Sequence, residues 1–161
     1  MGAMDWSRLR VLDFREGSLS TAFLSLLLPT ADRLPALESI GMTLPYLREG
    51  DLRKQKDDPN SSFSLIRRLF STARPQSLRD VRIWEHGRLL LPDIIDHHGS
   101  SLKSLSLHDE EDSDSDEQRT PLPVEDLMEI GTKFKGLEAL SLDVNISEEH
   151  TWVRIQYFSE I

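Results

Sequence analysis

The stretch that decides the fold is Leu102-Lys-Ser-Leu-Ser-Leu107. Leucine stands at its first and fourth positions, and an apolar residue stands at its sixth. Side chains two residues apart point to the same face of a strand, so Leu105 and Leu107 predict a short strand with one buried face. Ser104 and Ser106 fall on the opposite face. The stretch is therefore expected to place one side against a core and the other in water.

The same six-residue pattern occurs five times without gaps, at 9–14, 37–42, 78–83, 102–107 and 137–142. The fifth position of each copy is polar or glycine: Asp13, Gly41, Arg82, Ser106 and Ser141. Strands that are buried on both faces read as unbroken apolar runs, which these copies are not. We expect five strands that each expose one face to solvent.

Segments with helical spacing of apolar residues separate the copies, at 19–27, 63–70, 92–99 and 124–134. Ser61 or Ser62 is expected to cap the second helix. Pro92 suits the first position of the third helix, and Gly99 is expected to adopt the left-handed conformation after it. The sequence thus predicts four helices.

Alternation of strands and helices predicts an α/β fold with parallel strands joined by helical crossovers. A doubly wound sheet and a solenoid both satisfy this order. The repeated pattern and the polar alternate positions favour the solenoid, with five parallel strands on its concave side, four helices on its convex side and right-handed αβ repeats.

The five copies resemble the strand segments of leucine-rich repeats. Their irregular spacing is similar to the repeat regions of fungal F-box/leucine-rich-repeat proteins, and the units at 89–109 and 122–145 carry the strongest likeness. This resemblance implies a protein-binding module, such as the substrate-recognition part of a ubiquitin-ligase receptor. The asparagine that usually follows each repeat strand occurs once, as Asn145, and no F-box precedes Leu9. The ligase role therefore rests on the resemblance alone.

Composition narrows the function further. The 161 residues suffice for one domain, expected over 5–161, with 1–4 resembling an expression-vector remnant. The absence of cysteine excludes disulfides, thiolate metal sites and cysteine nucleophiles. No apolar run approaches the roughly 20 residues that span a bilayer. We expect a cytoplasmic or nuclear protein that does not bind membranes.

The net charge of −9 is concentrated in one place. Seven acids lie within 109–118, so the remainder carries a net charge of −2. Such a body lacks the basic stripe that nucleic-acid binding needs, and we expect no nucleic-acid partner. The two polar insertions expected from the sequence are 48–60, interpreted as plain loop, and 109–120, interpreted as a solvated acidic loop. Ser113 and Ser115 within the acidic loop are candidate sites for an acid-directed kinase.

The predicted concave face supplies the candidate binding residues. Arg and Trp are enriched at binding hot spots, which singles out the central copy with Arg82 and Trp84. The neighbouring candidates are Arg15, Thr43, Asp80, His108 and Asp143. The competing structural interpretation is that Trp84 folds over Leu89 or Leu90 while Arg82 merely pairs with Asp80.

Enzymatic and metal functions form the alternative class. Adjacent His97 and His98 point about 100° apart on a helix, so they do not readily share an ion, and we expect neither a metal site nor a cofactor. A small hydrolase or metal-dependent enzyme would draw on His108, Asp143 or the histidine pair. No nucleophile motif or phosphate-binding glycine loop supports it, and the sequence predicts a non-enzyme.

The two ends leave alternatives open. The first strand lacks a preceding polar capping unit, so we expect a further segment, a partner chain or self-association to cover that edge. Residues 151–158 are rich in β-forming residues, but Trp152, Ile155 and Phe158 also have helical spacing. The sequence does not decide between strand and helix there.

Overall fold

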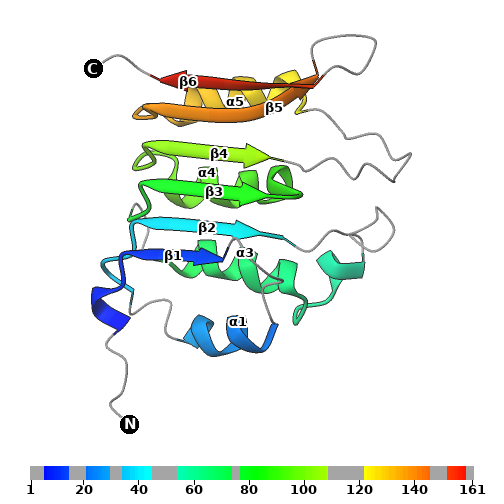
Figure 1. Ribbon diagram of the computed structural model, residues 1–161. Coiled ribbons are helices and arrows are strands. Elements are labelled where there is room, and N and C mark those ends of the chain that lie inside the picture. The colour runs from blue at the N-terminus through cyan, green and yellow to red at the C-terminus, as the bar shows by residue number, and fades with distance from the viewer. Residues whose placement is uncertain are drawn as a thin grey trace.

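The sheet is the frame of this molecule. The computed structural model describes residues 6–14, 21–29, 34–44, 54–73, 77–108, 122–145 and 152–158. Within them the strands lie in sequence order in one six-stranded sheet (Figure 1). They are β1 (Val11–Phe14), β2 (Ser39–Thr43), β3 (Asp80–Trp84), β4 (Ser104–His108), β5 (Ala139–Asn145) and β6 (Trp152–Phe158). The strands β1 to β5 are parallel, and β6 is antiparallel to β5, so the predicted α/β class with five parallel strands is confirmed.

The five sequence copies are also structural copies. The third residue of each copy pairs with the third residue of the next, in the series Val11, Ser39, Asp80, Ser104 and Ala139. Just before each strand, one carbonyl accepts two N–H groups of the following copy: the Lys103 carbonyl, for example, accepts from Glu138 at 2.8 Å and Ala139 at 2.9 Å. This repeated ladder gives the fold its repeat-like character.

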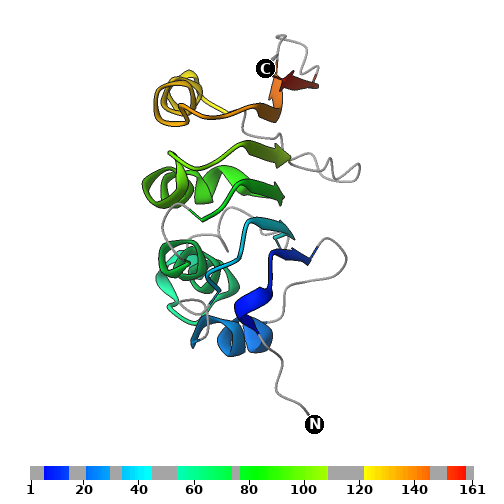
Figure 2. The ribbon, with the colours of Figure 1, turned by 90° about the vertical axis from the view of Figure 1, so that its left-hand side faces the viewer.

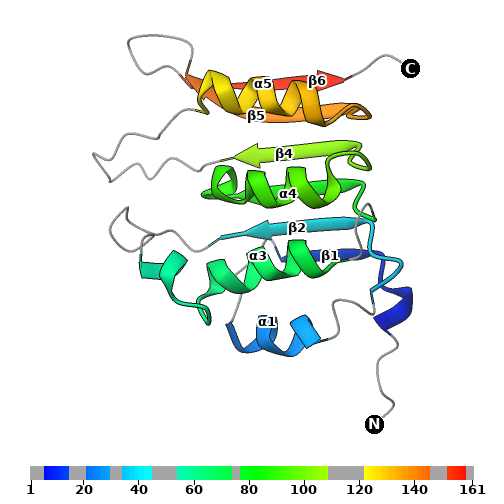
Figure 3. The ribbon, with the colours of Figure 1, turned by 180° about the vertical axis from the view of Figure 1, so that it is seen from behind.

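One helix fills each connection between parallel strands: α1 (Thr21–Leu27), α3 (Ser62–Thr72), α4 (Leu91–His98) and α5 (Val124–Lys133). Two short 3₁₀ helices, η1 (Trp6–Arg8) and η3 (Gly87–Leu90), precede β1 and α4. The four α-helices lie on the same side of the sheet, as the side view and the rear view show (Figures 2 and 3). A doubly wound sheet carries helices on both faces, so this arrangement differs from it.

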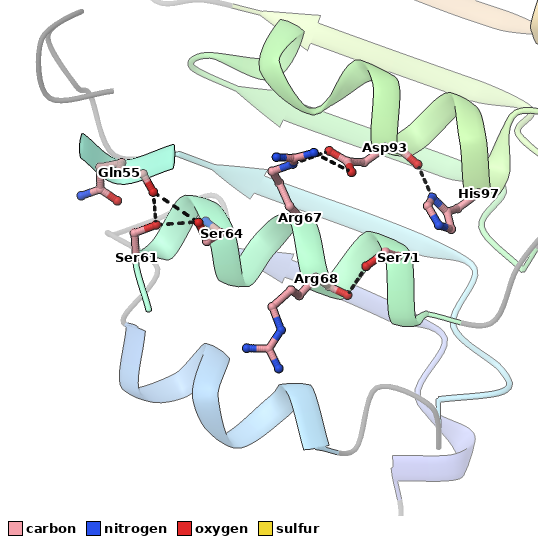
Figure 4. Close-up of polar contacts among 8 residues, drawn as sticks. All are labelled: Gln55, Ser61, Ser64, Arg67, Arg68, Ser71, Asp93 and His97. Atoms are coloured by element: carbon pink, nitrogen blue, oxygen red, sulfur yellow. Dashed lines mark hydrogen bonds and ion pairs between the residues drawn. The ribbon is translucent and has the colours of Figure 1, made fainter. Parts of the chain in front are cut away.

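Local signals at the helix ends were predicted in part. Ser61 caps α3, because its Oγ accepts from the Ser64 N–H at 3.1 Å and donates to the Gln55 carbonyl (Figure 4). The left-handed conformation expected at Gly99 is wrong: its φ is −53° and its ψ is −35°. Glycine is needed there for space, since a Cβ would lie 2.7 Å from the Ile95 carbonyl oxygen.

In one segment the structure differs from the sequence prediction, and in another it decides between two predicted alternatives. Residues 54–57 form a helical turn inside the insertion 48–60, which was interpreted as plain loop. Residues 152–158 form strand β6, which decides between the two alternatives left open for this end.

The acidic insertion 109–120 lies outside the described residues. Among the helices that the structure describes, none combines the length and apolarity that crossing a membrane requires.

The core lies between the helices and the inner face of the sheet. The first-position leucines of the three central copies, Leu37, Leu78 and Leu102, are fully buried. The fourth-position residues Ile40 and Val81 are fully buried as well. Helices α3 and α4 contribute further buried apolar side chains, which are Phe63, Leu65, Ile66, Leu69, Phe70, Leu91, Ile94 and Ile95. Burial of these apolar side chains thus decides which face of each strand packs against the helices and which face points away from them.

The turn after β3 holds two consecutive non-glycine residues in the left-handed region, Glu85 with φ 64° and His86 with φ 49°. Such backbone costs free energy because Cβ crowds the following carbonyl. We expect His86→Gly to raise the free energy of unfolding by roughly 0.5–1 kcal/mol relative to His86→Ala, which removes the same side chain but keeps Cβ. Urea unfolding followed by circular dichroism measures both. A glycine variant that is less stable than the alanine variant would contradict the strain.

Candidate functional site

The side of the sheet away from the helices forms the candidate site, and we call it the open face. It carries the third, fifth and seventh positions of the copies. Its described members on β2 to β5 are Ser39, Gly41, Thr43, Asp80, Arg82, Trp84, Ser104, Ser106, His108, Ala139, Ser141 and Asp143. Almost all are polar or small, in contrast to the apolar inner face. The open face is therefore the surface on which partly exposed polar side chains are held by the sheet.

A carboxylate–guanidinium cluster lies on β2 and β3 of the open face. The Arg82 Nη2 lies 2.7 Å from Asp80 Oδ2, and the Ser39 hydroxyl donates to the same oxygen at 2.8 Å. The Arg82 side chain remains 42% exposed. This pair is the one that the structural interpretation of Arg82 predicts. The contact orients the guanidinium and leaves it accessible to an incoming group.

Trp84 lies at the carboxyl end of β3, in register with Thr43 on β2 and His108 on β4. Its ring centroid is 6.4 Å from that of His108, with the ring planes tilted by 41°. The indole is partly exposed, whereas Leu90, one of the two residues proposed to lie beneath it, is fully buried in the core. Trp84 thus contributes aromatic surface to the open face.

His108 is the hub of a second polar group, which we call the His108 relay: Ser141, His108 and Asp143. The His108 Nδ1 lies 3.1 Å from Asp143 Oδ1, and its Nε2 lies 3.1 Å from Ser141 Oγ. A carboxylate only accepts hydrogen bonds, so in the neutral ring Nδ1 carries the proton and Nε2 accepts from the serine hydroxyl. His108 is 7% exposed and Asp143 is 13% exposed at its side chain. The base and the carboxylate of the relay are therefore nearly enclosed, whereas Ser141 is partly exposed.

The structure brings together most of the candidates from the sequence. Thr43, Trp84 and His108 form one row across three strands, and Asp143 joins that row through its bond to His108. Asp80 and Arg82 lie on β3 beside them. Arg15 and the two candidate phosphorylation sites, Ser113 and Ser115, fall outside the described residues.

The paired histidines occupy different surroundings. His97 donates from Nδ1 to the Asp93 carbonyl of its own helix at 3.0 Å, next to the ion pair between Asp93 and Arg67 (Figure 4). His98 is fully buried and bonds from Nε2 to the Phe70 carbonyl at 3.0 Å. Burial lowers the pKa of His98 below its ordinary value of 6.5, because the charged ring loses its hydration. In the part of the chain that the structure describes, no three His, Asp or Glu side chains converge to hold a metal ion.

Ser141 is the residue that sequence reasoning did not select. The sequence pattern placed Ser141 on the solvent-facing side of the fifth copy but did not link it to His108, which lies 33 residues away. The signal that finds it is the strand register: Leu107 pairs with Leu142, so His108 lies diagonally across from Ser141 and directly beside Asp143. Once register is known, the three side chains must share one face.

Comparison with protein-family models, with curated protein sequences and with solved structures found no match to this chain. The geometry of the open face is therefore the basis for inferring function. That geometry places three groups on a single sheet: the accessible guanidinium of Arg82, the aromatic ring of Trp84 and the imidazole of the His108 relay. Such a surface suits recognition of a polar, extended ligand.

Proposed function

We propose that this chain is a protein-interaction module whose open face binds a partner protein. In this proposal the repeat-like sheet is a short leucine-rich-repeat-like solenoid and the open face is its concave side. Arg82 and Trp84 act as anchors, with Arg15, Thr43, Asp80, His108 and Asp143 around them. The same proposal places the module in the substrate-recognition part of a ubiquitin-ligase receptor, as its sequence resemblance implies.

The observation that carries the proposal is the exposure of Arg82 and Trp84 on a sheet face that no described helix covers. The Asp80 carboxylate holds the guanidinium in one place, which lowers the conformational entropy lost when a partner binds. Trp84 adds a rigid aromatic surface beside it. Charged and aromatic anchors of this kind dominate binding free energy at protein interfaces.

A second binding mode uses the acidic insertion at 109–120 to attract a basic protein. The insertion directly follows His108, so it is tethered to the carboxyl end of β4, beside the anchors. Deleting residues 109–118 separates the two modes. Retained binding after this deletion, together with loss of binding in Arg82→Glu, assigns recognition to the open face.

The direct test is a pull-down from lysate of the source organism, with captured proteins identified by mass spectrometry. The bait is the intact chain or the Arg82→Glu/Trp84→Ala double variant. We expect the double variant to lose the specific partners at least about tenfold, which corresponds to roughly 1.4 kcal/mol or more of binding free energy. A ligase adaptor or a defined substrate among those partners would assign the ligase role.

A matched control carries the same kinds of change on the helix side. Arg68→Glu/Met128→Ala reverses one arginine on α3 and truncates one exposed apolar residue on α5. We expect this variant to capture the same partners as the unaltered chain. Equal recovery by both double variants, with circular dichroism showing both folded, would remove the open face as the recognition surface.

A further inference from the structure

We propose that Ser141 is an activated nucleophile and that the His108 relay hydrolyses carboxylic esters. This inference goes beyond partner binding, because its nucleophile, Ser141, is not among the proposed binding residues, although His108 and Asp143 belong to both. It rests on the positions of Ser141, His108 and Asp143 relative to one another. An enzyme was not expected from the sequence, in which no serine-hydrolase motif occurs.

The hydrogen-bond geometry supports proton transfer from Ser141. Its Oγ lies 3.1 Å from His108 Nε2, which is within the distance over which a general base accepts a proton. Asp143 Oδ1 lies 3.1 Å from the opposite ring nitrogen and fixes the tautomer that leaves Nε2 free of hydrogen. A nucleophile, a base and a group that orients the base are thus bonded in series, which is the arrangement that activates a serine.

The surroundings hold this arrangement in place. Ser141 and Asp143 stand two residues apart on β5, and His108 ends the neighbouring strand β4. The Trp84 ring lies beside His108, with ring centroids 6.4 Å apart, and the two hydrogen bonds to Asp143 and Ser141 orient the imidazole. Ser141 is itself only partly buried, so a small ester can reach its oxygen from the open face.

The negative charge that develops on the carbonyl oxygen of the ester needs a hydrogen-bond donor to stabilise it. Ser106 lies opposite Ser141 in the parallel register, on the same face and about 4.8 Å away along the hydrogen-bonding direction. Arg82 follows in the same row on β3. The Ser106 hydroxyl is the donor we assign to this role, with Arg82 contributing positive potential. A single hydroxyl stabilises an oxyanion less than two backbone N–H groups do, so we expect activity toward activated esters.

The reaction proceeds in two balanced steps. Ser141 Oγ bonds to the carbonyl carbon of p-nitrophenyl acetate while its proton moves to His108 Nε2, and the carbon–oxygen bond to p-nitrophenolate breaks. His108 releases this proton to solvent, which frees Nε2 again. Water then attacks the acetyl-serine and gives one proton to His108. The bond between Ser141 Oγ and the acetyl carbon breaks, His108 returns that proton to Ser141, and acetic acid leaves and ionises to acetate by releasing the second water proton to solvent. Water is the sole co-reactant.

The test uses the full chain with p-nitrophenyl acetate and with a fluorophosphonate probe. We expect a burst of p-nitrophenolate and a covalent adduct that peptide mass spectrometry places on Ser141. General-base activation predicts labelling on the order of 10²-fold faster than at a serine without a base. Ser141→Ala should abolish the adduct, and His108→Gln should reduce the labelling rate at least about tenfold.

Ser104→Ala is the matched control, because it removes the same oxygen from the open face of β4, outside the relay. It should label like the unaltered chain. Asp143→Asn should change the pH profile of labelling, since the amide no longer fixes the tautomer of His108. No adduct on the folded chain, or an adduct that persists in Ser141→Ala, would overturn the proposal.

Failure of this proposal is distinguishable from failure of the binding function. Ser141→Ala should capture partner proteins as well as the unaltered chain does. Arg82→Glu should lose partners and still form the Ser141 adduct, but at a lower rate, because the positive potential of Arg82 is lost. Loss of both properties in Ser141→Ala, with the fold intact, would contradict the separation between anchors and relay.

Discussion

Phe70→Ala is expected to lower the free energy of unfolding by about 3–5 kcal/mol, one of the largest losses that a single core truncation produces. Phe70 lies on α3 and is fully buried. Its ring contacts the His98 ring of α4 with centroids 6.4 Å apart, and its carbonyl accepts the His98 hydrogen bond. Removing the ring leaves a cavity between the two central helices and the sheet, in addition to losing apolar burial.

Urea unfolding of the variant, followed by circular dichroism, measures this loss. The control is Leu26→Ala on α1, where a side chain that is 75% exposed is truncated in the same manner. We expect this control to stay within about 0.5 kcal/mol of the unaltered chain. A Phe70→Ala variant that loses less than about 1 kcal/mol would show that α3 does not pack on the sheet as described.

The second large effect is loss of stability in acid through His98. Its pKa is lowered in the folded chain, mainly by burial, and its Nδ1 is buried with no hydrogen-bond partner among the described residues. Below pH 6.5 the unfolded chain binds a proton at His98 while the folded chain resists it, so unfolding becomes more favourable as the pH falls. The penalty grows by up to about 1.4 kcal/mol per pH unit, until the pH reaches the folded pKa.

Urea unfolding between pH 8 and pH 5 tests this linkage. His98→Gln should be less stable than the unaltered chain at pH 8 but should show a smaller decline toward pH 5, because it removes one proton-binding group. His97→Gln is the matched control, and it should retain most of the decline, because burial is the main cause of the lowered pKa of His98 and the charge of His97 contributes less. If His98→Gln and the unaltered chain decline in parallel, the folded chain does not hold His98 neutral.

The strands could be predicted because their signal is local. In each six-residue copy, the alternation of apolar and polar residues specifies a buried face and an exposed face. Because the copies share this pattern, they predict the same register between neighbouring strands. The same alternation predicts that Arg82, Trp84 and His108 lie on one face of the sheet. The strand β6 was undecided because Trp152, Ile155 and Phe158 satisfy helical spacing, and its pairing with β5 is a tertiary interaction that local sequence does not encode.

The His108 relay could not be predicted because its bonds join adjacent strands that are far apart in sequence. The copies predict the register between β4 and β5, which makes Ser141 the diagonal neighbour of His108. The register alone does not show that the two side chains form a hydrogen bond. The partner of His98 was hidden for the same reason, since Phe70 lies 28 residues away on another helix. Gly99 was misinterpreted because glycine also serves where a carbonyl approaches too closely for a Cβ.

Site-specific photocrosslinking in lysate tests most directly whether the open face is the recognition surface. A benzophenone amino acid at position 104, on the open face at the start of β4, is compared with the same group at position 128 on α5. The proposed function predicts discrete crosslinked partners from position 104 and none of those partners from position 128. The same partners captured from position 128 alone, or none from position 104, would contradict recognition through the open face.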